Sequence, residues 1–146
     1  MIQRILQAFM PPKKMIDLFT LKMSSTKPIE LVAQQVQNAC ESNHFALLQT
    51  YNYHEIVESK GFPMKRKVFI YDICQAKTAS LMLSTNPHFA IFMPCTLAIY
   101  ENDNETIIST MNMELLLKAV SSDKELYNEA KVLFSSFKSL MTSLTI

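Results

Sequence analysis

The three cysteines of this chain carry its most reactive groups, because a thiolate can act as a nucleophile, a redox partner or a metal ligand. They are Cys40, Cys74 and Cys95. Cys74 ends one predicted strand and Cys95 begins another, so the two thiols meet at one edge of the sheet if those strands are antiparallel neighbours. They could form a redox pair or serve as small buried side chains. The apolar neighbours Met93 and Leu97 favour burial of Cys95 over the redox role.

Other side chains that could carry chemistry do not form a recognisable motif. His44, His54 and His88 are too scattered for an HxH or HExxH metal site, and the ten methionines are more typical of an irregular core than of a soft-metal or heme pocket. The single glycine, Gly61, is too few for a Walker A loop, a dinucleotide fingerprint or a nucleophile elbow. We therefore expect no metal and no cofactor, and the sequence favours a protein that is not an enzyme.

Composition limits the partners and the compartment. The 146 residues are 49% hydrophobic and 18% charged, which is typical of a single folded domain. A net charge of +1 argues against binding to nucleic acid. The odd number of cysteines, without a CxxC pair, suits a reducing compartment, and the first residues lack the apolar core of a signal peptide. The sequence thus predicts a cytoplasmic location.

The first 14 residues form a predicted extension ahead of a single domain over residues 15–146. Apolar residues at helical spacing over residues 1–10 predict a short amphipathic helix that the Pro11-Pro12 pair ends. Such a helix would dock on its own domain or on a dimer mate; a peripheral membrane role for residues 1–14 is the alternative. A helix this short buries little apolar area, so contact with a membrane surface is not expected.

Hydrophobic periodicity predicts a mixed α+β domain in the order β-α-β-α-β-α-β-β-α. The predicted strands span residues 15–23, 44–51, 68–74, 89–100 and 106–111. Pro94 should lie at a bulge, an edge or a strand start, since it cannot donate to a ladder. In the turn between the last two strands, Asn104 is expected to adopt the left-handed conformation. Ser122 and Glu125 form a capping-box pattern ahead of the last helix.

The segment Phe92-Met93-Pro94-Cys95, the following Leu97–Asp103 and the later Met111-Asn112 resemble domain-of-unknown-function family 302. In that family a Met-Pro-Cys element leads into an apolar strand that ends in Tyr-Glu and an acidic turn. The resemblance covers about residues 15–144, and the chain departs from the family pattern at Asn104 and at Gln75-Ala76. It implies an antiparallel sheet of about five strands with helices packed mainly on one face, similar to the TATA-binding-protein-like fold. It also implies a homodimer, and it implies no activity.

These features together predict a homodimeric binding or interaction module for an unidentified small ligand. The apolar stripes of the first helix, the last helix and residues 1–10 together exceed what one sheet face should cover, which supports a dimer. An elongated groove between protomers, with Tyr71, Tyr100 and Met93 along it, would suit such a module. The alternative is a small thiol carrier that uses Cys95 with Cys74. The candidate ligand or thiol site comprises Cys74, Met93, Pro94, Cys95, Tyr71 and Tyr100.

Overall fold

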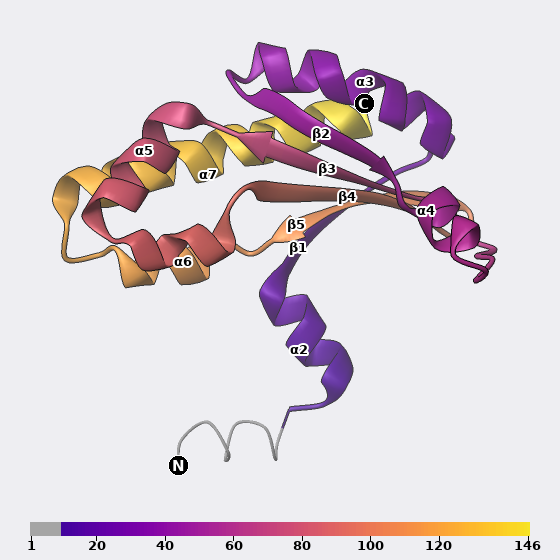
Figure 1. The fold of residues 1–146 in the computed structure, drawn as a ribbon, viewed down its shortest axis with the longest axis horizontal. Helices are drawn as coiled ribbons and strands as arrows, with labels where there is room; N and C mark the ends of the chain where they lie inside the picture. The colour runs from indigo at the N-terminus through magenta and orange to yellow at the C-terminus, as the bar shows by residue number, and fades with distance from the viewer. Residues whose placement is uncertain (1–9) are drawn as a thin grey trace.

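A computed structural model describes residues 10–146, so most of the helix expected over residues 1–10 lies outside the described residues (Figure 1). A five-stranded sheet forms the centre of the fold, with the order β1-β5-β4-β3-β2 and antiparallel pairing between all neighbours. The strands are β1 (Thr20–Ser25), β2 (Ala46–Asn52), β3 (Val68–Cys74), β4 (Cys95–Asn102) and β5 (Glu105–Met111). The predicted α+β class and five-stranded antiparallel sheet are confirmed.

Two long helices, α3 and α7, pack side by side on one face of this sheet and bury the main core. Leu97, Ile99 and Ile108 of the sheet are inaccessible to solvent, and Phe137 of α7 stacks edge-on against Phe45 at 5.4 Å between ring centroids. The helical segments are α2 (Pro12–Phe19), α3 (Ile29–Ser42), α4 (Tyr53–Ser59), α5 (Ala76–Thr85), the 3₁₀ helix η1 (Pro87–Phe92), α6 (Glu114–Ala119) and α7 (Lys124–Thr145).

The opposite face of the sheet carries side chains that are only partly buried along β3 and β4, whereas Ile107 and Ser109 of β5 are buried there. The cross-strand pair Ile70–Ala98 and the residue Tyr100 belong to this face, because side chains alternate along each strand and Leu97 and Ile99 face the helices. Helix α2 leads away from β1 on this side, below the sheet in the view of Figure 1, whereas α3 lies above it. The long apolar stripes of α3 and α7 are buried within the chain, so they supply no surplus for a dimer contact.

Two of the predicted strands are shorter than their apolar patterns indicate. The first begins at Thr20, because Pro12 starts helix α2, which continues through Phe19 and crosses the domain boundary expected at residue 14. The fourth begins at Cys95: the segment before it is η1, whose start is capped by Asn86. Apolar runs of this length fit helix and strand equally well, so the pattern alone misassigns them. Pro94 directly precedes β4, as predicted for a strand start, and follows a cis peptide bond.

The predicted details of one turn and one cap are also wrong by a single residue. Asp103, with φ of 53°, takes the left-handed position expected for Asn104. Asp123 caps α7, because its Oδ1 accepts a hydrogen bond from the Leu126 N–H at 3.0 Å, in place of Ser122. Among residues 10–146, no helix combines the length and the apolar character that crossing a membrane requires.

Candidate functional site

A cavity of about 560 Å³ lies at the end of the sheet where β3 finishes, β4 begins and β5 finishes. These ends meet because β3 and β4 are antiparallel neighbours, with Ile73 paired to Cys95. Most of the remaining wall comes from α5, α6, α7 and the 3₁₀ helix η1, at the left of Figure 1, and β2 adds Leu48. The Met-Pro-Cys element at the start of β4 therefore lies at this cavity. The rest of the cavity wall comes from segments that are far apart in the sequence.

None of the residues that line this cavity carries a charge, and most are apolar. Two of its few polar groups are already engaged. The Thr110 hydroxyl donates to the Thr96 carbonyl at 2.7 Å, and the Gln75 side-chain oxygen accepts from Thr78 at 2.8 Å. The lining is Leu48, Ile73, Cys74, Gln75, Ala79, Met82, Leu83, Ile91, Phe92, Met93, Pro94, Cys95, Thr96, Thr110, Met111, Met113, Leu116 and Leu133. Such a wall favours a neutral, apolar occupant.

The rim of the cavity exposes large apolar side chains to solvent. Ile91 is 81% exposed, Leu48 is 55% exposed and Phe92 is 43% exposed. Single exposed apolar residues are common, but these three border one cavity. An apolar ligand that enters here would cover surface that is otherwise in contact with water.

The two thiols at this site belong to opposite faces of the sheet. Cys95 is paired with Ile73, so both side chains lie on the helix-covered face, whereas the side chain of the next residue, Cys74, lies on the opposite face. Both thiols still line the cavity, because the strands end there. Burial raises the pKa of Cys95 to about 11, and the nearby Cys74 adds to this rise. A thiol with such a pKa is protonated at neutral pH and is a poor nucleophile, which weighs against a thiol-carrier role.

Four of the six predicted site residues come together at the cavity, namely Cys74, Met93, Pro94 and Cys95. The two tyrosines do not join them. Tyr71 pairs with Leu97 on the helix-covered face and is 3% exposed, with burial raising the pKa of its hydroxyl to about 12. Tyr100 is three residues from Leu97 and so lies on the opposite face. Tyr71 and Tyr100 therefore lie on opposite faces of the sheet, and neither lines the cavity with Met93.

Tyr71 instead borders a second hollow of about 410 Å³ between α3 and strands β2 and β3. Sequence reasoning missed the cavity walls that come from α5, η1 and the segment before α6, including Met82, Ile91 and Met113. The available signal was the apolar segment before Pro94, which was assigned to a buried strand. Its assignment to η1 explains why Ile91 is exposed at the rim.

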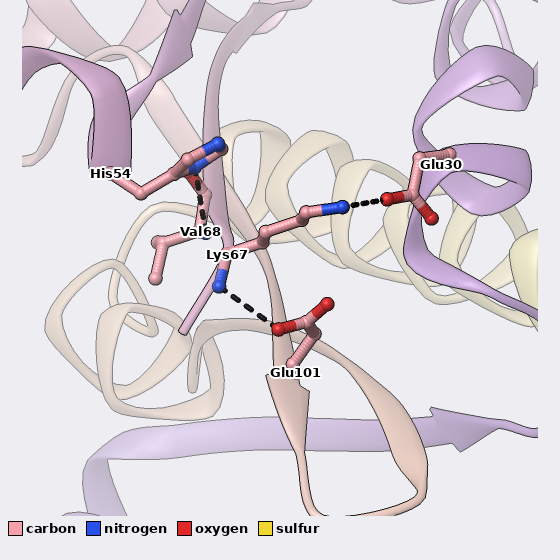
Figure 2. Close-up of polar contacts among 5 residues, drawn as sticks. All are labelled: Glu30, His54, Lys67, Val68 and Glu101. Atoms are coloured by element: carbon pink, nitrogen blue, oxygen red, sulfur yellow. Dashed lines mark hydrogen bonds and ion pairs between the residues drawn. The ribbon is translucent and has the colours of Figure 1, made fainter. Parts of the chain in front are cut away.

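A polar cluster at the other end of β3 joins four parts of the fold (Figure 2). The Lys67 ammonium pairs with Glu30 of α3, and the Lys67 backbone N–H donates to the Glu101 carboxylate at 3.1 Å. The Val68 N–H donates to Nδ1 of His54 in α4 at 3.1 Å. The ion pair lowers the pKa of Glu30 and raises that of Lys67, but both side chains are exposed. This cluster positions the strand start, and its surface ion pair adds little stability.

The fold and the site define a small α+β protein with an uncharged cavity at one end of an antiparallel sheet. The chain belongs to the DUF302 family (Domain of unknown function DUF302), whose model matches residues 21–144. The crystal structure of an uncharacterized conserved DUF302 protein from Bacillus stearothermophilus has the same fold, with a TM-score of 0.70 and 17% sequence identity, over 88% of this chain and 96% of that one. A search of curated proteins gives no match.

Proposed function

We propose that this DUF302 protein is a non-enzymatic binding module that holds a neutral, apolar small molecule in the cavity at the end of β3 and β4. The observation that carries the proposal is the absence of charge among the residues lining that cavity. A charged ligand would lose its hydration there without gaining an ionic partner, whereas an apolar ligand gains from leaving water.

The size of this gain is sufficient for binding. A ligand that buries about 200 Å² of apolar surface gains about 5 kcal/mol at 25 cal/mol per Å², and the ordering of both partners offsets part of it. The methionines of the wall can adapt to more than one ligand shape, because the unbranched thioether side chain has several rotatable bonds. We therefore expect micromolar to millimolar affinity for compact apolar molecules and moderate selectivity among them.

A neutral fluorophore such as 1-aminoanthracene tests this proposal by equilibrium titration. Ala79 of α5 lines the cavity, so Ala79→Phe places a ring in it and should weaken binding about tenfold or more. Ala76→Phe is the matched control, because Ala76 is exposed on the same helix and does not line the cavity. Equal affinity of the two variants would show that the fluorophore binds elsewhere, which would refute the proposal.

We further propose that the protein acts as a homodimer through the sheet face opposite α3 and α7. The support is the row of partly buried side chains on the central strands, which includes Ile70, Ala98 and Tyr100. A second copy of the same face would bury this row, and a two-fold contact needs only one self-complementary surface. The dimer is independent of the cavity, so each half of the proposal has its own test.

Sedimentation at micromolar concentration tests the dimer. The wild type should sediment at twice the 16.7 kDa chain mass, and Ile70→Glu should shift it to the monomer, since the new charge would be buried in the contact. Leu31→Glu is the matched control, because Leu31 is 48% exposed on α3, away from this face. A wild type that sediments only at 16.7 kDa contradicts the dimer.

A further inference from the structure

The loop that joins α4 to β3 exposes apolar and basic side chains next to one another. Every residue from Glu58 to Lys67 is exposed to solvent. Near the middle of this run Phe62 is 71% exposed and Met64 is 40% exposed, on either side of Pro63. None of these residues lines the cavity of the proposed function. The basic residues around the apolar pair are Lys60, Lys65, Arg66 and Lys67.

Hydrogen bonds at the end of α4 give Phe62 a defined position. The Gly61 N–H donates to the Glu58 carbonyl at 2.9 Å, and φ of Gly61 is 92°. The Phe62 N–H donates to the Val57 carbonyl at 3.3 Å. These two bonds form a Schellman motif, in which the residue after the glycine commonly packs against the helix. Because Phe62 is largely exposed, its ring makes little of this contact and is available to a partner.

Three of the four basic side chains are not neutralised by an ion pair. Lys67 pairs with Glu30 (Figure 2), whereas Lys60, Lys65 and Arg66 form no ion pair with any of residues 10–146. The acidic residues at this end of the sheet leave these three cations unpaired; they are Glu55 and Glu58 of α4, and Glu101, Asp103 and Glu105 of the β4–β5 hairpin. A negatively charged partner would therefore meet three available cations beside exposed apolar side chains.

We propose that this loop docks the protein on an anionic lipid bilayer. Phe62 and Met64 enter the headgroup region, where apolar side chains leave water, and the three unpaired cations lie against anionic headgroups. Single-stranded nucleic acid also attracts cations, but it binds through aromatic side chains on which bases stack, and Phe62 is the only aromatic residue among residues 58–67. The combination of charge and apolar surface favours the bilayer.

This docking goes beyond the proposed function and does not depend on it. The loop precedes β3, which begins at Val68 and finishes at Cys74 beside the cavity. In Figure 1, α4 lies at the right end of the sheet, whereas α5 and α6 lie at the left. A bilayer can therefore contact the loop without covering the cavity. The docking also differs from the membrane contact considered for residues 1–14, because it uses another segment.

Sedimentation of the full-length chain with lipid vesicles tests this docking. The wild type should bind vesicles of phosphatidylcholine with about 30% phosphatidylserine at least about tenfold more tightly than vesicles of phosphatidylcholine alone. Lys65→Ala/Arg66→Ala should weaken binding to the anionic vesicles about 25-fold, since each cation near the surface contributes about fivefold. Lys13→Ala/Lys14→Ala is the matched control, because it removes the same charge from exposed positions in α2 and should keep wild-type affinity.

A fluorophore at the loop reports insertion directly. The chain has no tryptophan, so Phe62→Trp introduces a single indole. Its emission should shift to shorter wavelength when anionic vesicles are added, because the ring leaves water. Val132→Trp is the matched control, since Val132 is 60% exposed on α7, and its emission should not shift. Phe62→Ser should weaken vesicle binding about tenfold, and Val132→Ser should leave it unchanged.

Thermal unfolding of each variant should match that of wild type, because all the substituted side chains are exposed. Equal binding to neutral and anionic vesicles would overturn the proposal, as would an unchanged emission of Phe62→Trp. Loss of binding in Lys13→Ala/Lys14→Ala but not in the loop variants would assign the contact to the first residues and also overturn it. Binding of an oligothymidylate as tight as that of the vesicles would contradict the choice of partner. The loop variants should keep wild-type binding of 1-aminoanthracene, so failure of the docking and failure of the proposed function give different results.

Discussion

Alkylation of Cys95 should be strongly suppressed in the folded protein. Burial and the adjacent Cys74 raise the pKa of Cys95 from the ordinary 9.0 to about 11. At pH 8 a thiol with a pKa of 9.0 is about 9% thiolate, whereas one at 11 is about 0.1% thiolate. Because only the thiolate reacts with iodoacetamide, the native rate should be about 100-fold below that of the denatured chain. Restricted access of the reagent slows it further.

The assay is iodoacetamide labelling from pH 7 to pH 10, with peptide mass spectrometry to separate Cys95 from Cys40 and Cys74. The native rate at Cys95 should rise about tenfold for each pH increase of one throughout this range, while the denatured rate levels off above pH 9. Cys40 is an internal reference, because it is inaccessible to solvent and burial raises its pKa to about 11 as well. A native rate at Cys95 within threefold of the denatured rate at pH 8 would refute this reasoning and favour the thiol carrier.

Three further predictions concern stability, each measured by urea unfolding. Asp123→Ala should lower the free energy of unfolding by about 1 kcal/mol, because α7 loses its cap. Ser122→Ala should change it by less than about 0.5 kcal/mol. Equal losses in the two variants would indicate that Ser122 also caps the helix, as the capping-box pattern predicts. Phe137→Ala should cost about 3–5 kcal/mol because it empties the centre of the core, and a loss below 1 kcal/mol would contradict the packing against Phe45. The raised pKa of Cys40 means that the unfolded chain releases this proton first, so this thiol should contribute about 2 kcal/mol to the fall in stability from pH 9 to pH 11, and Cys40→Ala should remove that part; a variant with the same pH profile as wild type would contradict the burial of this thiol.

The sequence predicts those parts of the fold in which a single local hydrophobic pattern specifies the structure. The dense β-branched and aromatic run Val68–Cys74 is a strand from end to end, and the hairpin around Asp103 pairs as its alternation indicates. Alternation also places Leu97 and Ile99 together on the buried face. In each case the local preference and the tertiary position agree, so the pattern is sufficient.

The remaining parts depend on contacts between distant segments. Nothing in the sequence near Met93 indicates that Met82 of α5 and Met113 beside α6 complete one cavity with it. The strand register, which is not apparent from sequence, is what separates Tyr71 from Tyr100 onto opposite faces. The sequence does place Cys74 and Cys95 at strand ends with Met93 and Pro94 beside them, and these four residues line the cavity.

The most direct test of the central claim is a comparison of three ligands that share one ten-carbon chain and differ only in charge: an alcohol, a carboxylate and an ammonium. Each displaces 1-aminoanthracene from the wild-type protein at pH 7.5, and its dissociation constant is measured. Because no charged residue lines the cavity, the neutral alcohol should bind at least about tenfold more tightly than either ion. A carboxylate or ammonium that binds as tightly as the alcohol would contradict the account.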